Sequence, residues 1–376
     1  MRRLRVAYVA HSVDPRRGGM ELVNARLLER LAELVDLEVV AGDGLETLPP
    51  GVRRTHVPIP RRPSVARLVA FDLLGTLRLL AVRRRCDLVH TCGAVVHARA
   101  DVVTMHLSHA AVIEAQGGAR PPGRTGMGGA IGSLRRRAAA AMERWALQPG
   151  RARRLVAISS ADAADLAARY PDVELVLIEN GIDVPAARDP AVLRTDPALA
   201  LRVVVVAGDF ERKRVELAIR AVSRTARCRL RVVGNGDLAV MRELARSLGS
   251  ADRVELLGHR SDVWAELLAA DVVLSCSAHE SFGLAVAEGA AAGCAVVCTN
   301  TGVGPELCLD DGGGPGGMVV EATEGAITEA LERLDADRAL CRAMGDVASS
   351  HARRFSWDSM AASTLGLYDE LTRQGS

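Results

Sequence analysis

Short runs rich in valine and leucine alternate along most of this chain with longer runs in which apolar residues recur at helical spacing. Strand patterns that alternate with helical patterns predict βα units and a parallel sheet. The run Arg202–Ala207, with four consecutive valines, predicts a strand buried on both faces of such a sheet. The expected strands are 4–10, 37–41, 87–91, 101–105, 154–158, 173–178, 202–207, 229–233, 254–257, 272–275 and 295–298, and the expected helices are 20–34, 65–84, 134–147, 161–170, 215–225, 238–248, 263–270 and 283–292.

The chain has 376 residues, more than one hydrophobic core usually supports, so we expect two domains. The dipeptide Asn180-Gly181 and the proline-rich polar stretch Pro185–Pro197 predict the junction between them. We therefore expect domains at residues 1–183 and 184–356. Both should be α/β, Rossmann-like and doubly wound, facing each other across a cleft with ligands at the carboxyl ends of their strands.

No segment predicts a membrane span or a secretory signal. The apolar stretch Val65–Val82 is interrupted by Arg67, Asp72 and Arg78, which indicates an amphipathic helix. The first apolar run, Val6–Ala10, is too short for a signal peptide. The eight cysteines are scattered without a Cys-x-x-Cys pair, which is typical of small buried thiols. We expect a soluble, cytoplasmic protein.

Charge is distributed unevenly along the chain. Residues 1–180 carry 27 arginines against 18 acidic residues, a net charge of +9, whereas the remainder carries 21 basic and 28 acidic residues, a net charge of −7. This asymmetry favours an anionic partner for the first half, such as an anionic or lipid-linked acceptor or a membrane surface. Nucleic acid is disfavoured because no aromatic residues are interleaved with the arginines.

Two features of the first half leave alternatives open. The helix at 134–147 carries Arg135–Arg137 at one end and Trp145 near the other, a pattern compatible with a membrane interface or with a solvated helix end. The glycine-rich segment Gly117–Ser133 has no periodicity and reads either as an acceptor loop or as a plain connection.

The strongest candidate for a chemical site is the segment His279–Glu288, which follows an expected strand and leads into a helix. Glu280 precedes that helix and Glu288 lies within it, so the two carboxylates can reach different parts of one extended ligand. Gly283 allows close backbone approach, and the N–H groups of a helix start suit a diphosphate. The alternative is that Glu280 only caps the helix and Glu288 is solvated.

Further candidates follow other expected strands. Arg212 and Lys213, the only lysine of the chain, come soon after the four-valine strand. His106 ends the expected strand at 101–105, with His109 as a weaker competitor. A nicotinamide enzyme is disfavoured because Gly234-x-Gly236 lacks the third glycine of a dinucleotide fingerprint. No convincing pair of metal-binding aspartates is present, so we expect no metal.

These segments resemble the retaining glycosyltransferases of family 4, which have the GT-B fold. HESFGLAVAEGAAAGCAVV, residues 279–297, is similar to the family pattern E-x-F-G-x-x-x-x-E-A-x-A-x-G-x-P-V-V, with Gly289 after the second glutamate and Ala295 in place of proline. Other similar segments are Gly18-Gly19-Met20-Glu21 (GG-x-E), Ile178–Asp183 (I-P-N-G-I-D), Val233–Gly236 (V-G-x-G) and Phe355-Ser356-Trp357 with Tyr368, which resembles a terminal helix, here 357–376, that crosses back to the first domain.

The segment Asp209-Phe210-Glu211-Arg212-Lys213 resembles the element of the family that grips the leaving diphosphate. Asp209 stands where the family has arginine, so Arg212 is the candidate replacement. This form is most similar to the lipopolysaccharide-core glucosyltransferases, although Arg214 replaces their glycine.

The resemblance implies retaining, metal-independent transfer of a hexose from a nucleotide-diphosphate sugar, with a UDP-sugar favoured and no cofactor. By the same resemblance, Arg212 and Lys213 neutralise the diphosphate, Glu280 binds sugar hydroxyls and Glu288 binds the ribose. His106 would lie beside the donor sugar. The other implied substrate-binding residues are Gly18, Gly19, Gly234, His259, Arg260, Ser281, Phe282, Gly283 and Leu284.

Two alternatives stay open at this point. A nucleotide-sugar epimerase of the same architecture would convert the donor without a second substrate. A non-catalytic sugar-nucleotide-binding protein would keep the glycine motifs but lose the charged residues, and the presence of Lys213, Glu280 and Glu288 disfavours it.

Overall fold

The computed structural model describes residues 3–60, 64–115, 126–184, 199–260 and 262–374. The chain separates into two compact units. Unit 1 comprises residues 1–181 and 357–376, and unit 2 comprises residues 182–356. The proline-rich stretch expected as a linker lies outside the described residues.

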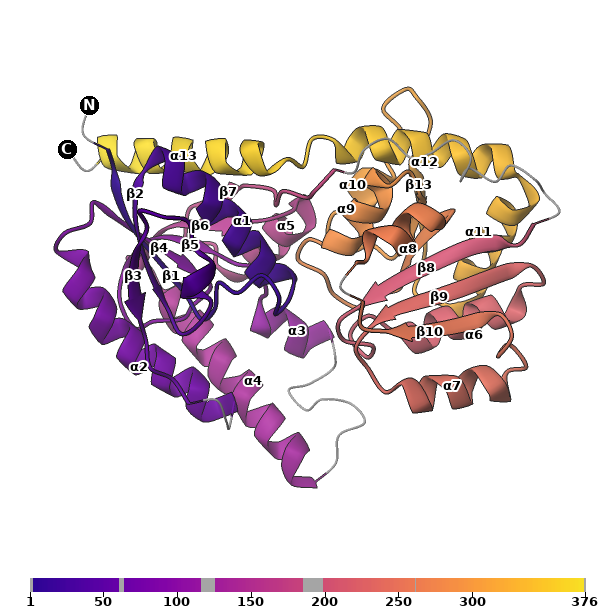
Figure 1. Cartoon of the computed structure of the whole chain (residues 1–376), viewed down its shortest axis with the longest axis horizontal. Helices are drawn as coiled ribbons and strands as arrows, with labels where there is room; N and C mark the ends of the chain where they lie inside the picture. Colours follow the sequence, from indigo (N-terminus) through magenta and orange to yellow (C-terminus); the bar gives the residue numbers. More distant parts are fainter. Residues whose placement is uncertain (1–2, 61–63, 116–125, 185–198, 261, 375–376) are drawn as a thin grey trace. The chain divides into compact units, whose positions relative to one another are not determined.

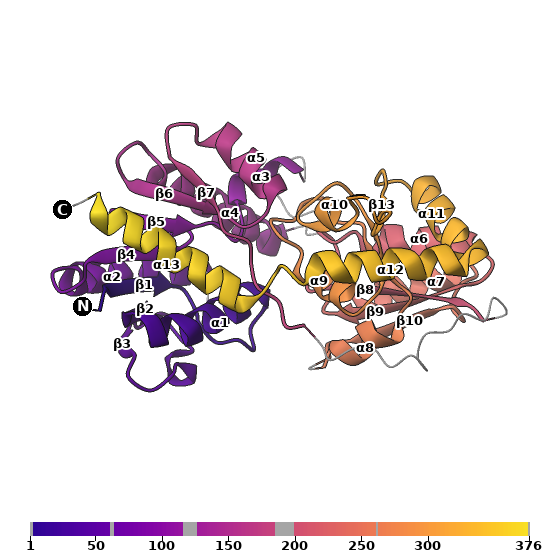
Figure 2. The ribbon, with the colours of Figure 1, turned by 90° about the horizontal axis from the view of Figure 1, so that it is seen from above.

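Unit 1 is built on a seven-stranded parallel sheet in the order β3-β2-β1-β4-β5-β6-β7. Helices α1 and α13 cover one face and pack against each other, while α2 and α4 cover the opposite face (Figures 1 and 2). The strands are β1 (Arg5–Ala10), β2 (Asp36–Ala41), β3 (Arg53–His56), β4 (Leu88–Cys92), β5 (Ala100–Thr104), β6 (Ala152–Ala157) and β7 (Leu175–Leu177), and the helices are α1 (Gly19–Leu34), η1 (Leu45–Thr47), α2 (Ser64–Arg83), α3 (His109–Ala115), α4 (Gly126–Ala146), α5 (Ser160–Arg169) and α13 (Trp357–Arg373).

The C-terminal helix α13 is part of unit 1. Asp358 at its start pairs with Arg30 of α1 at 2.7 Å. Further along, the Tyr368 hydroxyl lies 2.6 Å from Nδ1 of the buried His90 on β4. These contacts tie the end of the chain to the first sheet.

Unit 2 is built on a six-stranded parallel sheet in the order β10-β9-β8-β11-β12-β13. Its strands are β8 (Leu201–Ala207), β9 (Cys228–Gly234), β10 (Val254–Gly258), β11 (Val272–Ser275), β12 (Ala295–Cys298) and β13 (Gly317–Val319), and its helices are α6 (Val215–Arg224), α7 (Leu238–Ser247), α8 (Trp264–Ala269), α9 (Leu284–Ala291), α10 (Gly304–Leu307), α11 (Glu324–Ala336) and α12 (Arg338–Ala352).

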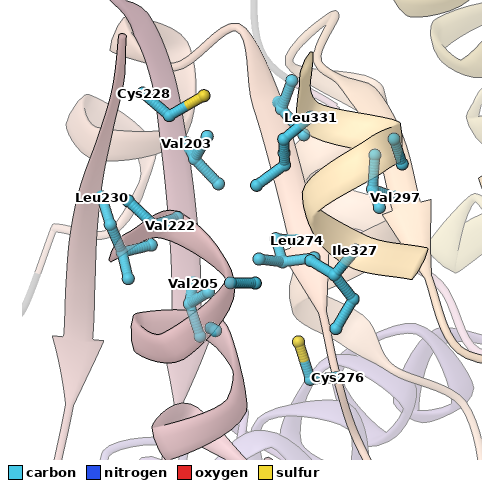
Figure 3. Close-up of a cluster of buried hydrophobic side chains, with 14 of the residues drawn as sticks. Val203, Val205, Val222, Cys228, Leu230, Leu274, Cys276, Val297, Ile327 and Leu331 are labelled. Atoms are coloured by element: carbon cyan, nitrogen blue, oxygen red, sulfur yellow. The ribbon is translucent and has the colours of Figure 1, made fainter. Parts of the chain in front are cut away.

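The core of unit 2 lies between this sheet and the helices α6 and α11. Figure 3 shows Val203, Val205 and Leu274 of the central strands facing Ile327 and Leu331 of α11. Val203, Val204 and Val205 are all at most 3% exposed. Because neighbouring residues of a strand point to opposite faces, the predicted strand buried on both faces is confirmed.

The expected strands and helices are all present, and most ends agree within two residues. Several elements carried no strong pattern and were not predicted. One is the edge strand β3, whose residues Arg53–His56 are polar. The other elements that were not predicted are η1, α3, α10, β13, α11 and α12.

Of the eight cysteines, seven are buried and one, Cys86, is half-buried, and all are free thiols, as expected.

Two expectations about unit 1 need correction. The glycine-rich segment is not irregular throughout, because α4 begins at Gly126 and Gly129 is buried; residues 117–125 lie outside the described residues. Packing of α4 against α2 and α3 overrides the low helix propensity of glycine. Helix α2 is not amphipathic in the expected sense, because leucines also occupy its outward face. Within the described ranges, no helix is long and apolar enough to cross a membrane.

Candidate functional site

Two loops of unit 2 that are far apart in the sequence lie together at one edge of its sheet. Strands β8 and β11 are neighbours and parallel, so the segments that follow them leave the sheet side by side. The amide of Ala278, after β11, donates to the carbonyl of Arg212, after β8, at 3.1 Å. This contact brings the Arg212-Lys213 pair to the His279–Glu288 segment.

Three charged side chains meet where these loops touch. Glu280 Oε1 pairs with Arg212 Nη1 at 3.0 Å and also forms a close ion pair with the Lys213 ammonium. The same oxygen accepts a hydrogen bond from Ser277 Oγ at 2.9 Å. Arg212 Nη1 donates in addition to the carbonyl of His279 at 3.0 Å. We call Arg212, Lys213 and Glu280 the cationic cluster, because two cations and one carboxylate leave one positive charge.

The cationic cluster is largely shielded from water, yet its carboxylate is ionised. The exposed fractions of the Arg212, Lys213 and Glu280 side chains are 23%, 13% and 9%. Burial opposes ionisation of Glu280, but the charges of Lys213 and Arg212 and the hydrogen bonds from Lys213 and Ser277 outweigh it, so the pKa of Glu280 lies below its usual range. Such fixed charges in a water-poor place suit a ligand with negative charge.

A third loop, after β12, hydrogen-bonds to the loop after β11 that carries Glu280. Thr299 Oγ1 donates to the Ser277 carbonyl at 2.8 Å, and the Val303 amide donates to the Phe282 carbonyl at 2.7 Å. Gly302 has a positive φ of 58°, and a Cβ there would lie 2.3 Å from the Phe282 oxygen. Sequence reasoning missed Ser277, Thr299 and Gly302. The available signal was a run of small residues, T-N-T-G-V-G, directly after a buried strand.

The segment after Glu280 folds as a tight turn into helix α9. Gly283 is the N-cap of α9 with a left-handed φ of 92°, and no side chain caps the helix. Glu280 is therefore not a helix cap. Ser281 and Phe282 are buried, with the Phe282 ring edge-on to Phe355 at 5.3 Å, and Leu284 is the half-buried first residue of α9. The turn presents the start of α9 beside the cationic cluster.

Glu288 lies in α9 and is not a freely solvated residue. Its side chain is partly buried, and it lies near the carboxylate of Asp183. Burial and the charge of Asp183 raise the pKa of Glu288 to about 7. Near neutral pH this carboxyl is thus close to half ionised, unlike Glu280.

Gly234 has a packing role that the sequence pattern alone did not specify. It adopts a φ of 137°, and a Cβ at this position would lie 1.8 Å from the carbonyl oxygen of Ala207. A Cβ on Gly236 would similarly overlap the Phe210 ring, at 2.2 Å. The loop after β9 therefore packs directly on the Gly208–Phe210 segment that leads to Arg212.

His259 and Arg260 lie apart from the cationic cluster. Both are exposed and follow the edge strand β10, which β9 and β8 separate from β11. Among the described residues, no hydrogen bond or ion pair joins either side chain to Arg212, Lys213 or Glu280. Unit 2 by itself thus gathers only some of the predicted residues.

Unit 1 holds its own cavity, of about 320 Å³, at the carboxyl ends of β1, β4 and β5. His106 lines it together with His11 and His109, and Arg67 and Arg135 lie in its wall. We call it the histidine cavity. Met20 of α1 also lines the histidine cavity. Gly18 and Gly19, which are exposed at the start of α1, directly precede Met20 in the sequence.

The imidazoles of the histidine cavity are neutral at physiological pH. Burial lowers the pKa of His106 to about 4. Burial, with the Arg67 charge, lowers the pKa of His11 to about 4, and burial with the charges of Arg135 and Arg136 does the same for His109. Neutral imidazole has one donor and one acceptor nitrogen, which suits hydroxyl groups.

A buried glutamate fixes the loop after β5, which carries His106 and His109. Glu143, only 1% exposed, is the one acidic residue of α4. Its carboxylate accepts from the Ser108 hydroxyl at 2.6 Å, the His109 amide at 2.7 Å and the Tyr170 hydroxyl at 2.8 Å. Sequence reasoning missed Glu143, although a lone acid among arginines and alanines was a visible signal.

Metal binding has no evident place in the described part of the chain, where no three or more His, Cys, Asp or Glu side chains gather in a way that could hold an ion. The arrangement in unit 2 instead offers fixed cations and backbone amides. The arrangement in unit 1 offers neutral hydrogen-bonding groups with arginines at the wall.

Comparison with known proteins agrees with the motifs. A family model described as Glycosyltransferase Family 4 matches residues 17–185, and one described as Glycosyl transferases group 1 matches residues 201–337. The D-inositol 3-phosphate glycosyltransferase of Mycobacteroides abscessus is 33% identical over 228 residues, which are 57% of this chain and 48% of that relative. The chain spans less than half the length of the first curated relatives that it matches.

Solved structures share the fold over nearly the whole chain. WaaG, a glycosyltransferase involved in lipopolysaccharide biosynthesis, has a TM-score of 0.73 at 21% identity, with 96% of this chain and 98% of that chain covered. HepE of Anabaena, solved in complex with UDP-glucose, has a TM-score of 0.69 at 18% identity, with 98% and 100% covered.

These likenesses, the ordered motifs and the two parallel Rossmann-like sheets all agree. Residues 17–185 and 201–337, which together make up most of the chain, thus belong to the domain families described as Glycosyltransferase Family 4 and Glycosyl transferases group 1, and the chain has the GT-B fold.

Proposed function

We propose that this glycosyltransferase transfers a hexose from a UDP-sugar to an anionic acceptor, with retention of anomeric configuration and without a metal. The observation that carries the proposal is the cationic cluster, in which Glu280 and Ser277 hold Arg212 and Lys213 in place. The UDP-glucose complex of the HepE structure supports the choice of donor. Resemblance to the retaining enzymes of family 4 supports the stereochemistry.

Arg212 and Lys213 neutralise the charge that develops on the leaving diphosphate. Their positions are set before the donor arrives, so little reorganisation is needed in the transition state. The N–H groups at the start of α9, behind Gly283, add partial positive charge for the same phosphates. Gly18 and Gly19, at the start of α1, give the phosphates a second place of close backbone approach.

Glu280 has two tasks in this proposal. Its Oε1 positions both cations, and within the described residues no hydrogen bond is made to Oε2, which is left for a hydroxyl of the sugar. Glu288 accepts the ribose hydroxyls in its ionised form. Ser281 and the Phe282–Leu284 backbone line the same edge and complete the donor site. His259 and Arg260 contact only the periphery of the donor in this proposal.

The reaction breaks the bond between the anomeric carbon and the diphosphate oxygen, and the acceptor oxygen forms its bond on the same face of the sugar. The departing diphosphate takes the acceptor proton, so neither a side-chain nucleophile nor a metal is required. His106, neutral in the histidine cavity, offers a hydrogen bond to the donor sugar.

The histidine cavity is the proposed acceptor site. His11 and His109 suit hydroxyls of a polyol or sugar, while Arg135, which makes no ion pair within the described residues, suits an anionic group on the acceptor. The curated relatives named D-inositol 3-phosphate glycosyltransferases favour a phosphorylated acceptor, either free or lipid-linked. We place the enzyme in the cytoplasm, with peripheral contact to the membrane through basic unit 1.

A screen of nucleotide sugars by thermal shift, followed by turnover with the donor that binds, tests the proposal. We expect a UDP-hexose to raise the melting temperature by mass action and to give a product with the donor's anomeric configuration by NMR. Full activity with a chelator present is also expected. Conversion of the donor alone, without acceptor, would identify an epimerase, and binding without any turnover would identify a sugar-nucleotide-binding protein.

A further inference from the structure

Helix α2 exposes a row of apolar side chains on the surface of unit 1. Val69, Leu73, Leu77 and Leu80 are 45%, 58%, 64% and 51% exposed. Spacings of four, four and three residues place them on one side of the helix. The opposite side is also apolar, with Phe71 fully buried under the sheet. We call these four residues the α2 stripe.

Such a stripe is unusual for a helix at the surface of a globular domain. Surface helices normally present polar residues to water opposite their buried side. Single exposed leucines are common, but a contiguous apolar row marks a place where another surface binds. Helix α2 lies on the outer side of the sheet of unit 1, opposite α13 (Figure 1). The α2 stripe therefore requires a cover that the chain itself does not supply within the described residues.

The exposed charged side chains of α2 and of the turn that follows it, residues 64–85, are arginines. Arg78 and Arg84 are exposed and form no ion pair within the described residues. The only carboxylate of α2, Asp72, is 6% exposed and lies 2.6 Å from Nδ1 of His97. Arg84 lies four residues after Leu80 and continues the row, whereas Arg78 lies on its flank, and α2 presents no exposed carboxylate.

The neighbouring helix α4 has the same character. It packs against α2, and it exposes Ile131 at 41% and Leu134 at 58%. Its Arg137 is exposed, whereas its single acid, Glu143, is buried. Apolar and cationic groups without exposed acids are what an interfacial helix presents to an anionic bilayer.

We propose that the α2 stripe docks unit 1 on a lipid bilayer with anionic headgroups. Val69, Leu73, Leu77 and Leu80 enter the boundary between headgroups and acyl chains, while Arg78 and Arg84 reach the lipid phosphates. This proposal specifies the peripheral membrane contact of unit 1 that the proposed function includes, and it rests on the proposed function only in that respect. It assigns the membrane contact to α2 and not to Arg135–Arg137, because Arg135 lines the histidine cavity.

A second copy of the chain fits the α2 stripe less well. In a two-fold dimer the same patch faces itself, so the arginines beside the stripe would meet arginines of the other copy. The stripe is also small. Eleven residue steps of 1.5 Å make it about 16 Å long and one side chain wide. A stable protein interface needs roughly 800 Å² from each partner.

Co-sedimentation of the full chain with vesicles tests the proposal, with phosphatidylcholine alone and with phosphatidylcholine plus phosphatidylglycerol. We expect the wild type to bind the anionic vesicles and to be released as salt rises. Replacing Leu73, Leu77 and Leu80 together by Gln should weaken binding on the order of a hundredfold, from the apolar area lost. Arg78→Gln with Arg84→Gln should weaken it about 25-fold, roughly fivefold per arginine.

A matched control lies on unit 2, where Val240 and Leu309 are 54% and 58% exposed. Val240→Gln with Leu309→Gln should bind vesicles as the wild type does. Replacing Arg135, Arg136 and Arg137 by Ser should weaken binding less than the leucine variant does. If the triple leucine variant does not fold, as judged by circular dichroism, Leu77→Gln alone should still weaken binding about fivefold.

Two results would overturn the proposal. One is vesicle binding that the leucine and arginine variants leave unchanged, or no binding by the wild type. The other is a wild-type dimer in sedimentation velocity that the leucine variant abolishes, which would assign the stripe to a second copy. Donor thermal shift is measured on the same samples. If the wild type binds the donor but not the vesicles, only the proposal for the α2 stripe fails. If no donor raises the melting temperature, only the proposed function is contradicted.

Discussion

The cationic cluster of unit 2 and the histidine cavity of unit 1 lie in equivalent places, at the carboxyl ends of parallel strands, yet burial has opposite results in them. Glu280 is buried but keeps its charge, because Lys213 and Arg212 contact the same carboxylate oxygen. His106 is buried, and its pKa falls to about 4, so it is neutral. Direct opposite charges outweigh desolvation in one site, and desolvation decides the other.

In the proposed function, this difference divides the chemistry between the two units. A site with fixed net charge suits a diphosphate, whose charge increases as the bond to the sugar breaks. A site of neutral imidazoles suits hydroxyl groups, which must stay uncharged until the acceptor proton leaves. Four predictions can break or sharpen this comparison.

The largest effect is expected from Lys213→Ala, which removes one fixed cation of the cluster. Turnover should fall by about two to three orders of magnitude, as loss of one preorganised charge donor does elsewhere. The fold should remain, because Arg212 still neutralises Glu280. Steady-state kinetics with circular dichroism measures both. Arg246→Ala, on the exposed face of α7, is the control, and near-normal turnover of Lys213→Ala would contradict the role of the cluster.

The next largest effect separates the two glutamates. Glu280→Gln should weaken the sugar-bearing donor more than free UDP, because free UDP has no sugar for Glu280 to bind. Glu288→Gln should weaken both equally, because both contain the ribose. Loss of a buried hydrogen-bonding partner costs about 1–3 kcal/mol, or roughly 5- to 150-fold in affinity. Calorimetry with UDP and the UDP-sugar decides, and the reverse pattern would exchange the two roles.

A smaller effect concerns pH, and its sign differs between the units. The folded pKa of Glu288 is raised from 4.5 to about 7, so the stability from its protonated form is complete below pH 4.5 and is lost as pH rises through 7. The folded pKa of His106 is lowered from 6.5 to about 4, so its contribution is complete above pH 6.5 and is lost as pH falls through 4.

Thermal melts at pH 5 and pH 8 check these signs. Glu288→Gln should stabilise the protein more at pH 8 than at pH 5, and His106→Gln should relieve the acid destabilisation near pH 5. Each kcal/mol corresponds to about 2–4 °C for domains of this size. UDP affinity should also fall below pH 7 in the wild type and become insensitive to pH in Glu288→Gln. Equal shifts at both pH values would contradict the assigned pKa values.

The smallest effect is expected at Arg214, just after the two cations. Arg214 has a left-handed φ of 49°, and it is the one residue other than glycine with positive φ in the described part of the chain. In unit 1, by contrast, the cavity residue with positive φ is Gly93. Arg214→Gly should stabilise unit 2 by about 0.5–1 kcal/mol, since glycine adopts this conformation freely. Arg214→Ala is the matched control and should bring no gain in a thermal melt.

Much of the fold was predictable from local pattern. The Arg202–Ala207 strand, the strand Val272–Ser275 and the helix start after Gly283 follow from residue type and spacing within a few positions. The family resemblance also rested on short ordered segments. The polar edge strand Arg53–His56 escaped prediction because its place in the sheet, and not its composition, makes it a strand.

The candidate site was predictable in part. Arg212, Lys213 and Glu280 could be named from two separate segments, but their shared contact joins residues 68 and 67 positions apart. Ser277, Thr299 and Gly302 act by supporting that contact. The run of small residues after β12 marked Thr299 and Gly302 as parts of a loop, but their partners in the loop after β11 could not be read from it. His259 and Arg260, named with the rest, follow an edge strand and make no hydrogen bond or ion pair with the cluster among the described residues.

The sequence by itself determined the alternation of the main strands and helices, the family resemblance and the identity of the charged residues, because these depend on neighbours along the chain. Only the tertiary structure decided which groups stay charged and which side chains stay exposed. Charge depends on burial and on partners from distant segments, as at Glu280 and His106. Exposure depends on which face of a helix meets the sheet, and for that reason the prediction of an amphipathic helix did not show that Leu73, Leu77 and Leu80 lie at the surface.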